Sequence, residues 1–265
     1  MTPRVLILGG TAEARDLAAE LVARPGVDVV SSLAGRVSRP RLPAGRVRIG
    51  GFGGPEALAH WLRHEGVAAV VDATHPFAER ISRSAARAAA DADVPLVALT
   101  RPGWTPGPGD RWVWVDSLAE AAEALPGLGR RAFLTTGRQG LAAFAGLGEL
   151  WFLVRCVDPP ECALPPRHLL ILDRGPYTLA GELTLFDAHG IDLLVSKDSG
   201  GGQVAAKLAA ARERGAPVVM VRRPGRPDVP GVATVAEAVA WLGARGALSP
   251  GGDGAYRPSA PGRGG

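Results

Sequence analysis

Three short turns combine glycine with side chains that could bind an anion. Each follows an apolar run, and they are Gly9-Gly10-Thr11, Thr135-Thr136-Gly137-Arg138 and Lys197-Asp198-Ser199-Gly200-Gly201-Gly202. Glycine lets a backbone approach a ligand closely, and the free N–H groups at the start of a helix attract negative charge. We therefore consider all three turns as candidates for binding phosphate or carboxylate groups.

The first turn departs from the usual dinucleotide pattern. Its spacing is GGTxE rather than GxGxxG. Thr11 could cap the following helix with its hydroxyl, while Glu13 would favour the positive end of the same helix and compete there with a phosphate. Read alone, the turn leaves two interpretations open, a ligand-binding turn and a tight turn with a good cap.

Three basic or titratable side chains add further chemistry. Arg138 offers a planar fork for a carboxylate or phosphate. His75 ends a buried run and could donate a proton or bind a carboxylate, or be held by backbone hydrogen bonds instead. Arg36 follows the second predicted strand, where arginine favours the 2′-phosphate of NADP, the alternative being an exposed arginine. The third turn, Lys197–Gly202, is not a P-loop, because its lysine precedes the glycines instead of following them.

Other classes of function find little support in the sequence. Cys156 and Cys162 are the only cysteines, and their spacing fits neither CxxC nor a zinc set. The net charge is +4, but the arginines are scattered and lack interleaved aromatic residues, which favours a polyanionic small ligand over nucleic acid. No apolar run reaches the roughly 20 residues of a membrane helix, and no leader precedes Val5. We expect a soluble, cytoplasmic protein with no metal, nucleic-acid or membrane partner.

The elements that must position these residues alternate between strands and helices. The predicted strands of the first half are Val5–Leu8, Val27–Leu33, Ala68–Val71 and Pro95–Leu99, with helices at Ala12–Ala23, Glu56–His64 and Ala78–Ala90. A second alternation includes strands at Ala132–Thr135, Trp151–Val154, Leu193–Val195 and Val218–Val221 and helices at Thr178–His189, Gln203–Arg214 and Val235–Leu242. Such alternation is typical of parallel sheets with right-handed crossovers.

The turn-rich segment 101–128 separates the two alternations. We predict an α/β protein of two Rossmann-like lobes with parallel sheets and an interdomain cleft. The first is a nucleotide-binding domain over residues 1–110, the second spans residues 111–248, and a disordered tail covers 249–265. Ligands bind beyond the carboxyl ends of such strands, which is where the three turns lie.

The ordered series of motifs resembles the precorrin-6A reductase family of cobalamin biosynthesis. The motifs are LILGGTAEAR, SLAGR, GGFGG, DATHPFA, RPGW, FLTTGRQ, the RCVDPP/RGPY pair and SKDSGG, over about residues 4–245. The resemblance implies NADPH-dependent reduction of one C=C bond of precorrin-6A, a polycarboxylate tetrapyrrole, to give precorrin-6B. A close relative of the family acts on the cobalt-containing precursor, and the sequence leaves open which substrate and which nicotinamide cofactor are used.

The resemblance also implies roles for the singled-out residues. The cofactor set comprises Gly9, Gly10, Thr11, Glu13, Ala14, Arg36, Thr74 and Pro76. The substrate set comprises Thr136, Gly137, Arg138, Asp198, Ser199 and Gly200. The candidate catalytic residues are His75, Lys197 and Tyr177, with water as another proton donor.

Within the cofactor set, we expect Glu13 to hold its own loop's backbone or a ribose hydroxyl. A nucleotide-binding regulatory protein without redox chemistry is the rival hypothesis. Polar groups that converge from both lobes favour the reductase over that rival.

Overall fold

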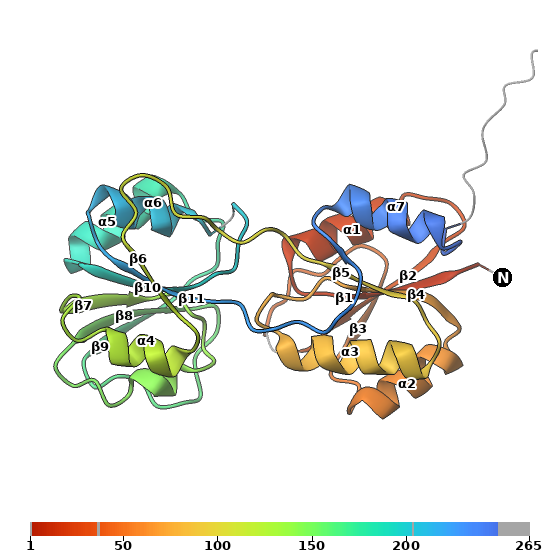
Figure 1. The fold of residues 1–265 in the computed structure, drawn as a ribbon, viewed down its shortest axis with the longest axis horizontal. Helices are drawn as coiled ribbons and strands as arrows, with labels where there is room; N and C mark the ends of the chain where they lie inside the picture. The colour runs from red at the N-terminus through yellow and green to blue at the C-terminus, as the bar shows by residue number, and fades with distance from the viewer. Residues whose placement is uncertain (1, 36–37, 203, 249–265) are drawn as a thin grey trace, which may run out of the picture.

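The computed structural model describes residues 2–35, 38–202 and 204–248, which form two α/β lobes side by side (Figure 1). Each lobe has a six-stranded sheet with helices on both faces, and every strand pair is parallel. The predicted α/β fold with parallel sheets is confirmed.

The first sheet has the strand order β12-β5-β4-β1-β2-β3. Its strands are β1 (Arg4–Leu8), β2 (Asp28–Leu33), β3 (Arg46–Ile49), β4 (Val67–Asp72), β5 (Leu96–Leu99) and β12 (Gly231–Val232). One face packs against α1 (Ala12–Val22) and α7 (Val235–Ala244), the other against α2 (Pro55–His64) and α3 (Glu79–Asp91). Because β1 is covered on both faces, it reads as a continuous apolar run rather than an alternating one.

The second sheet has the order β6-β11-β10-β7-β8-β9. Its strands are β6 (Trp112–Val115), β7 (Arg131–Leu134), β8 (Trp151–Cys156), β9 (His168–Leu172), β10 (Leu193–Lys197) and β11 (Val218–Val221). Helices α5 (Leu179–His189) and α6 (Ala206–Glu213) cover one face, while α4 (Leu118–Ala124) and the 3₁₀ helix η1 (Leu141–Phe144) cover the other. Both sheets thus repeat one arrangement.

The chain returns to the first lobe after it completes the second. Strand β12 pairs with β5, and Ala238 and Leu242 of α7 are buried in the same core as α1. The predicted domain of residues 111–248 therefore needs correction, because residues 231–244 belong to the first lobe. Periodicity identifies a helix but not the sheet on which it packs. The expected tail, 249–265, lies outside the described residues.

Threonine caps begin several helices, as their sequence positions suggest. Thr11 accepts a hydrogen bond from the N–H of Ala14, and Thr234 forms a complete capping box with Glu237. The helix expected at Gln203–Arg214 begins only at Ala206 and ends at Glu213, and Gln203 is outside the described residues. Within the described part of the chain, no helix is long and apolar enough to span a membrane.

Candidate active site

Each sheet has one place where neighbouring strands send their connections to opposite faces. In the first lobe it lies between β1, which leads into α1, and β4, which leads into α3. In the second lobe it lies between β7 and β10, which lead into η1 and α6. Ligands of open α/β sheets bind at such switch points. The predicted motifs follow these four strands, so the sequence located both switch points.

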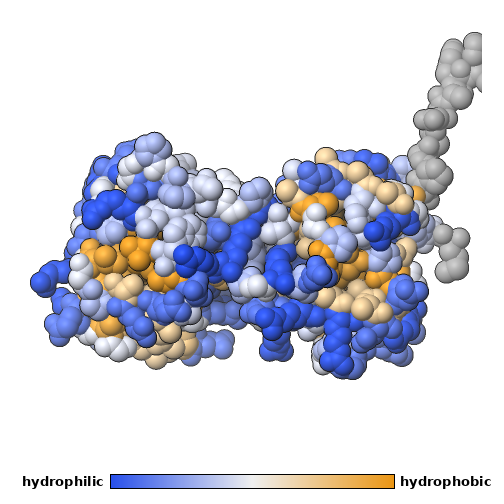
Figure 2. All heavy atoms as spheres, in the orientation of Figure 1, coloured by the Kyte–Doolittle hydropathy of each residue, from blue (hydrophilic) through white to orange (hydrophobic). Residues whose placement is uncertain are grey.

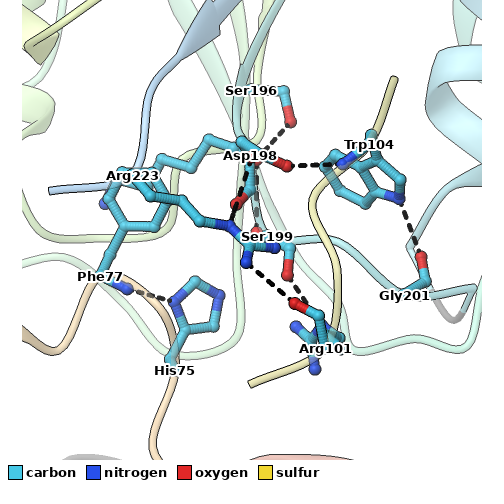
Figure 3. A network of polar contacts seen from close by, with 10 residues as sticks. His75, Phe77, Arg101, Trp104, Ser196, Asp198, Ser199, Gly201 and Arg223 are labelled. Carbon is cyan, nitrogen blue, oxygen red and sulfur yellow. Dashed lines mark hydrogen bonds and ion pairs between the residues drawn. The ribbon is translucent and has the colours of Figure 1, made fainter. Parts of the chain in front are cut away.

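The switch points meet where the lobes adjoin, a region that we call the junction. Phe77, from the loop after β4, packs against the core of the second lobe, and the Nζ of Lys197 lies 5.5 Å from its ring centroid. Figure 3 shows His75 and Phe77 alongside Arg223 and the loop of Asp198 and Ser199. On the face drawn in Figure 2, hydrophilic residues gather between the lobes. The structure thus brings His75 and Lys197 to one polar site.

Further contacts between the lobes join loops at the carboxyl ends of other strands. The hydroxyl of Ser38 donates to Asp158 Oδ1 at 2.6 Å. Arg41 Nη2 donates to the carbonyl of Gly175 at 3.1 Å, and Arg174 Nη1 donates to the carbonyl of Arg39 at 2.9 Å. The carboxyl ends of both sheets therefore face the junction.

One of the two roles expected for Glu13, holding the backbone of its own loop, needs correction, while a contact with a ribose hydroxyl stays a prediction. Its Oε2 pairs with Nη1 of Arg101 at 2.7 Å, so its partner is the segment after β5 rather than its own loop. Thr11 fixes the turn instead, since its hydroxyl accepts from Ala14 N–H at 3.1 Å and donates to the Ala73 carbonyl at 2.8 Å. Ala14 is buried, and its side chain belongs to the core.

The glycines of the third turn serve a contact that the sequence did not reveal. Gly200 and Gly201 have φ values of +65° and +75°. A Cβ on Gly200 would overlap the carbonyl oxygen of Pro102, and one on Gly201 would lie 2.8 Å from Arg101 Cδ. Only glycine meets both the backbone and the packing requirement here. The loop Asp198–Gly201, which we call the glycine loop, is thereby packed against the segment that joins the lobes.

Hydrogen bonds reinforce this packing (Figure 3). The N–H of Trp104 donates to Asp198 Oδ1 at 2.9 Å, and its indole Nε1 donates to the Gly201 carbonyl at 3.0 Å. Two segments cross between the lobes, residues 100–111 from β5 to β6 and residues 222–230 from β11 to β12, and we call them the first and second crossing segments. In the second, Arg223 Nε donates to the Asp198 carbonyl at 2.9 Å and pairs with Asp198 Oδ2 at 3.2 Å. Asp198 thus binds residues from both segments that connect the lobes.

His75 is held as a neutral ring at pH 7. Enclosure by the two lobes, followed by the charges of Arg101, Lys197, Lys207 and Arg223, lowers its pKa from 6.5 to about 3. The side chain of His75 remains exposed to water at the junction, so the enclosure lowers its pKa less than full burial would, but the pKa is still lowered. The N–H of Phe77 donates to Nδ1 at 3.2 Å, which assigns the proton of the neutral ring to Nε2.

The other two candidate proton donors differ in their surroundings. Lys197 ends β10 at the junction, and burial lowers its pKa, which makes the ammonium a stronger acid. Tyr177 lies in the loop between β9 and α5, where the guanidinium carbon of Arg155 is 3.7 Å from the centroid of its ring. Its hydroxyl donates to the Asp173 carbonyl at 3.1 Å, and burial raises its pKa. Tyr177 is therefore engaged by Arg155 and a backbone carbonyl, whereas Lys197 is one of the charges that act on His75.

The remaining predicted residues are placed as follows. Thr74 is buried, and its hydroxyl donates to Asp72 Oδ1 at 2.6 Å, so it shapes the loop that carries His75 and the buried Pro76. Thr136 is buried beside the exposed Gly137. The pKa of Asp158 is lowered, mainly by the hydrogen bond from the Ser38 hydroxyl and to a smaller extent by the positive charge of Arg138. Arg36 lies outside the described residues.

A buried charged cluster behind the second switch point escaped the sequence analysis. Arg155 and Glu182 form an ion pair of 2.6 Å with side chains 4% and 1% exposed. Lys207 is also buried, and its Nζ donates to Thr135 Oγ1 at 2.9 Å. The arginine inside the apolar strand Trp151–Cys156 was the available signal. The chain has two lysines, Lys197 and Lys207, and the charges of both act on His75 at the junction.

Comparisons with known proteins agree on one family. The model described as "Precorrin-6x reductase CbiJ/CobK" matches residues 4–243. A precorrin-6A reductase of Rhodococcus erythropolis is 58% identical over 241 residues, covering 91% of this chain and 97% of the relative. One of Mycobacterium tuberculosis (strain ATCC 25618 / H37Rv) is 51% identical over 242 residues, covering 90% and 97%. A solved structure described as "CobK precorrin-6A reductase" has a TM-score of 0.88 at 42% identity, covering 94% of this chain and 99% of that one.

Proposed function

Because the chain belongs to the precorrin-6x reductase CbiJ/CobK family, we propose that it transfers a hydride from NADPH to one C=C bond of precorrin-6A. It is a reductase of precorrin-6A in cobalamin biosynthesis and uses a nicotinamide cofactor. The preference for NADPH and the residue roles below are our inference. The carrying observation is the meeting of both switch points, which sets Lys197 close enough for its charge to act on His75.

The turn between β1 and α1 fits the pyrophosphate of the cofactor. Gly10 has a φ of +122°, and an added Cβ would meet nothing within 4 Å, so space is open over the turn. The turn leads into the N-terminus of the 11-residue α1. The negative charge of Glu13 alone would repel a phosphate from the start of α1. Its ion pair with Arg101 neutralises that charge. We infer that Gly9, Gly10 and Thr11 hold the pyrophosphate and that Arg36 binds the 2′-phosphate. When bound, NADPH supplies the hydride.

The second lobe presents positive charge to a polycarboxylate substrate. Lys197 and Lys207 of this lobe, together with Arg101 and Arg223 of the crossing segments, all lower the pKa of His75, so their fields overlap at the junction. A tetrapyrrole with several carboxylates is attracted by such a site. We infer that the substrate lies against the turn of Thr136, Gly137 and Arg138 and the adjoining glycine loop. Its reacting carbon then faces the first lobe.

Proton delivery falls to Lys197 in this arrangement. A neutral His75 is a poor acid, but its Nε2–H can donate a hydrogen bond that orients the ring system of either bound molecule. Lys197 has an acid strength raised by burial and lies on the same side of the junction as the glycine loop. General acid catalysis by a positioned group contributes about 10²–10⁴-fold. We therefore assign Lys197 as the proton donor and His75 as an orienting group.

Turnover with defined substrates tests this function. The purified protein is mixed with NADPH and precorrin-6A, and the loss of nicotinamide absorbance is followed together with formation of precorrin-6B. We expect oxidation of NADPH that depends on precorrin-6A and slows with NADH. Parallel reactions with cobalt-precorrin-6A determine which macrocycle is preferred.

Two results would contradict the proposal. A protein that binds NADPH tightly but never oxidises it with either macrocycle would be a nucleotide-binding regulatory protein. A protein that prefers NADH would retain the reductase function but reject the assignment of NADPH. Measurement of cofactor affinity beside turnover distinguishes the two.

A further inference from the structure

One guanidinium group connects the cofactor turn to the glycine loop. Arg101 follows β5 by two residues, in the first crossing segment. Its Nη1 pairs with Glu13 Oε2 at 2.7 Å, and its Nε donates to the carbonyl oxygen of Ser199 at 2.7 Å. Glu13 lies in the first turn of α1, whereas Ser199 belongs to the second lobe. The planar, rigid fork of arginine means that neither contact can shift without moving the other.

The backbone of Arg101 is held as firmly as its side chain. Its carbonyl oxygen accepts a hydrogen bond of 2.9 Å from Nη1 of Arg223, which also binds Asp198 (Figure 3). The side chains of Arg101 and Glu13 are 17% and 25% exposed, so water screens their pairing only in part. Gly201 packs directly against the Arg101 side chain. Arg101 is therefore fixed on three sides at the centre of the junction.

Binding of an anion at the cofactor turn must alter the surroundings of this guanidinium. The turn of Gly10 and Thr11 directly precedes Glu13, so a pyrophosphate there brings negative charge close to the Glu13–Arg101 pair. The fork then either binds both anions or turns from Glu13 toward the new one. In the first case the guanidinium that binds Ser199 is tied to both anions and held more firmly. In the second case the direction of Nε, and with it the bond to Ser199, changes.

We propose that Arg101 is a positioning residue that couples cofactor binding in the first lobe to the arrangement of the glycine loop, and thereby to tetrapyrrole binding in the second. This inference rests on the proposed function, which places the two ligands on these two elements. Coupling between two binding sites is reciprocal, so the cofactor tightens substrate binding by the factor with which the substrate tightens cofactor binding. Typical coupling factors are about 5- to 150-fold.

A thermodynamic cycle with NADP⁺ measures this coupling without turnover, because NADP⁺ has no hydride to donate. The dissociation constant of NADP⁺ is determined with and without saturating precorrin-6A. For the unaltered protein we expect roughly tenfold tighter binding with the macrocycle present. In Arg101→Gln the factor should fall to about one. Glu13→Gln keeps the bond from Arg101 to Ser199 but removes the charge from the link to α1, so its factor should fall as well.

The double variant and a matched control complete the design. Combining Arg101→Gln with Glu13→Gln should cause no further loss of coupling, because both changes break one connection. Arg24→Gln removes an exposed ion pair with Glu20 in the same helix α1, and it should leave the coupling factor unchanged. If Arg101→Gln does not fold, Glu13→Gln alone decides the question.

Unchanged coupling in both single variants, or a factor of one in the unaltered protein, would overturn the inference. Failure of the proposed function is separate, since it appears as absent oxidation of NADPH by the unaltered protein.

Discussion

The ammonium group of Lys207 donates a hydrogen bond of 2.9 Å to the hydroxyl of Thr135, which begins the turn after β7. The hydroxyl of Thr135 donates a hydrogen bond of 2.9 Å to the carbonyl of Val195, so the lysine helps to hold β7 and β10 together at the second switch point. Burial, then the positive charge of Arg155, lowers the pKa of Lys207 to about 7, although Glu182 opposes the shift. The charge of this lysine therefore changes near neutral pH.

Substrate affinity should weaken as the pH rises through 7. Below that value Lys207 is charged and adds to the positive field at His75, and above it the charge is lost. We expect the KM for precorrin-6A to rise by about fivefold from pH 6 to pH 8, equivalent to ~1 kcal/mol for one charge across the site. Lys207→Met should show a raised KM at pH 6 and a flat profile. A variant with an unaltered profile would exclude Lys207 as the source.

The same group predicts how stability depends on pH. The pKa of Lys207 is lower in the folded protein than the 10.5 of an unfolded chain, so the unfolded state binds more protons between about pH 7 and pH 10. The free energy of unfolding should therefore rise as the pH increases from 7 towards 10. Denaturant titrations at pH 6 and pH 9 measure this difference. Lys207→Met should reduce it, and an equal difference in the variant would contradict the assignment.

Replacement of Lys197 by alanine should lower kcat by about 10²-fold while the protein remains folded. The physical reason is the loss of the proposed proton donor at the end of β10, where the strand itself is held by its neighbours β7 and β11. Tyr177→Phe is the comparison, since its hydroxyl is already bonded to the Asp173 carbonyl. We expect kcat of that variant to stay within a few-fold of the unaltered enzyme. Stopped-flow turnover measures kcat of both variants, and a melting curve checks that both are folded. An equal loss of kcat in the two variants would reject Lys197 as the donor.

Arg36→Ala should narrow the preference for NADPH over NADH by at least about tenfold, because a hydrogen bond to a charged group contributes about 1.5–3 kcal/mol. The measurement is kcat/KM with each cofactor. Arg24→Gln, just beyond the C-terminal end of α1, is the control. An unchanged ratio in Arg36→Ala would show that the 2′-phosphate is bound elsewhere.

Glu182→Gln should destabilise the protein without touching the proposed reacting groups. The buried guanidinium of Arg155 lies 3.7 Å from the centroid of the Tyr177 ring and 4.8 Å from that of Phe133, and Glu182 is its carboxylate partner. Removal of one member of a buried ion pair costs about 3–5 kcal/mol. Chemical denaturation measures the loss. A change below ~1 kcal/mol would mean that water or another group compensates Arg155.

The sequence could locate the site because parallel sheets place chemistry at strand ends. Gly10, His75, Arg138 and Lys197 each follow an apolar run, and local patterns suffice to identify such runs. The partner of Glu13 could not be predicted from the sequence, since Arg101 is 88 positions away and no local pattern indicates the pair. Likewise, the return of the chain to the first lobe depends on which sheet edge remained for β12 to pair with and which sheet face remained for α7 to cover.

Lys207 illustrates a different limit. Its place on the buried side of α6, with Ala210 and Ala211, is visible from helical periodicity, but a lysine in such a position is ordinarily counted as solvent-exposed. The glycine loop shows a related limit. A glycine-rich loop signals that something approaches the backbone, yet not whether it is a ligand or, as at Gly200, the chain's own Pro102.

The pairing of the chain's only two lysines at one site makes amine chemistry a selective reporter. Elsewhere the protein carries its positive side-chain charge on arginine, which acylating reagents do not modify at neutral pH. Of the two lysines, such a reagent should label the half-buried Lys197 first and reach Lys207 only when the second lobe opens. Mass spectrometry of two peptides would then follow ligand protection and local opening in the native enzyme, without an engineered probe.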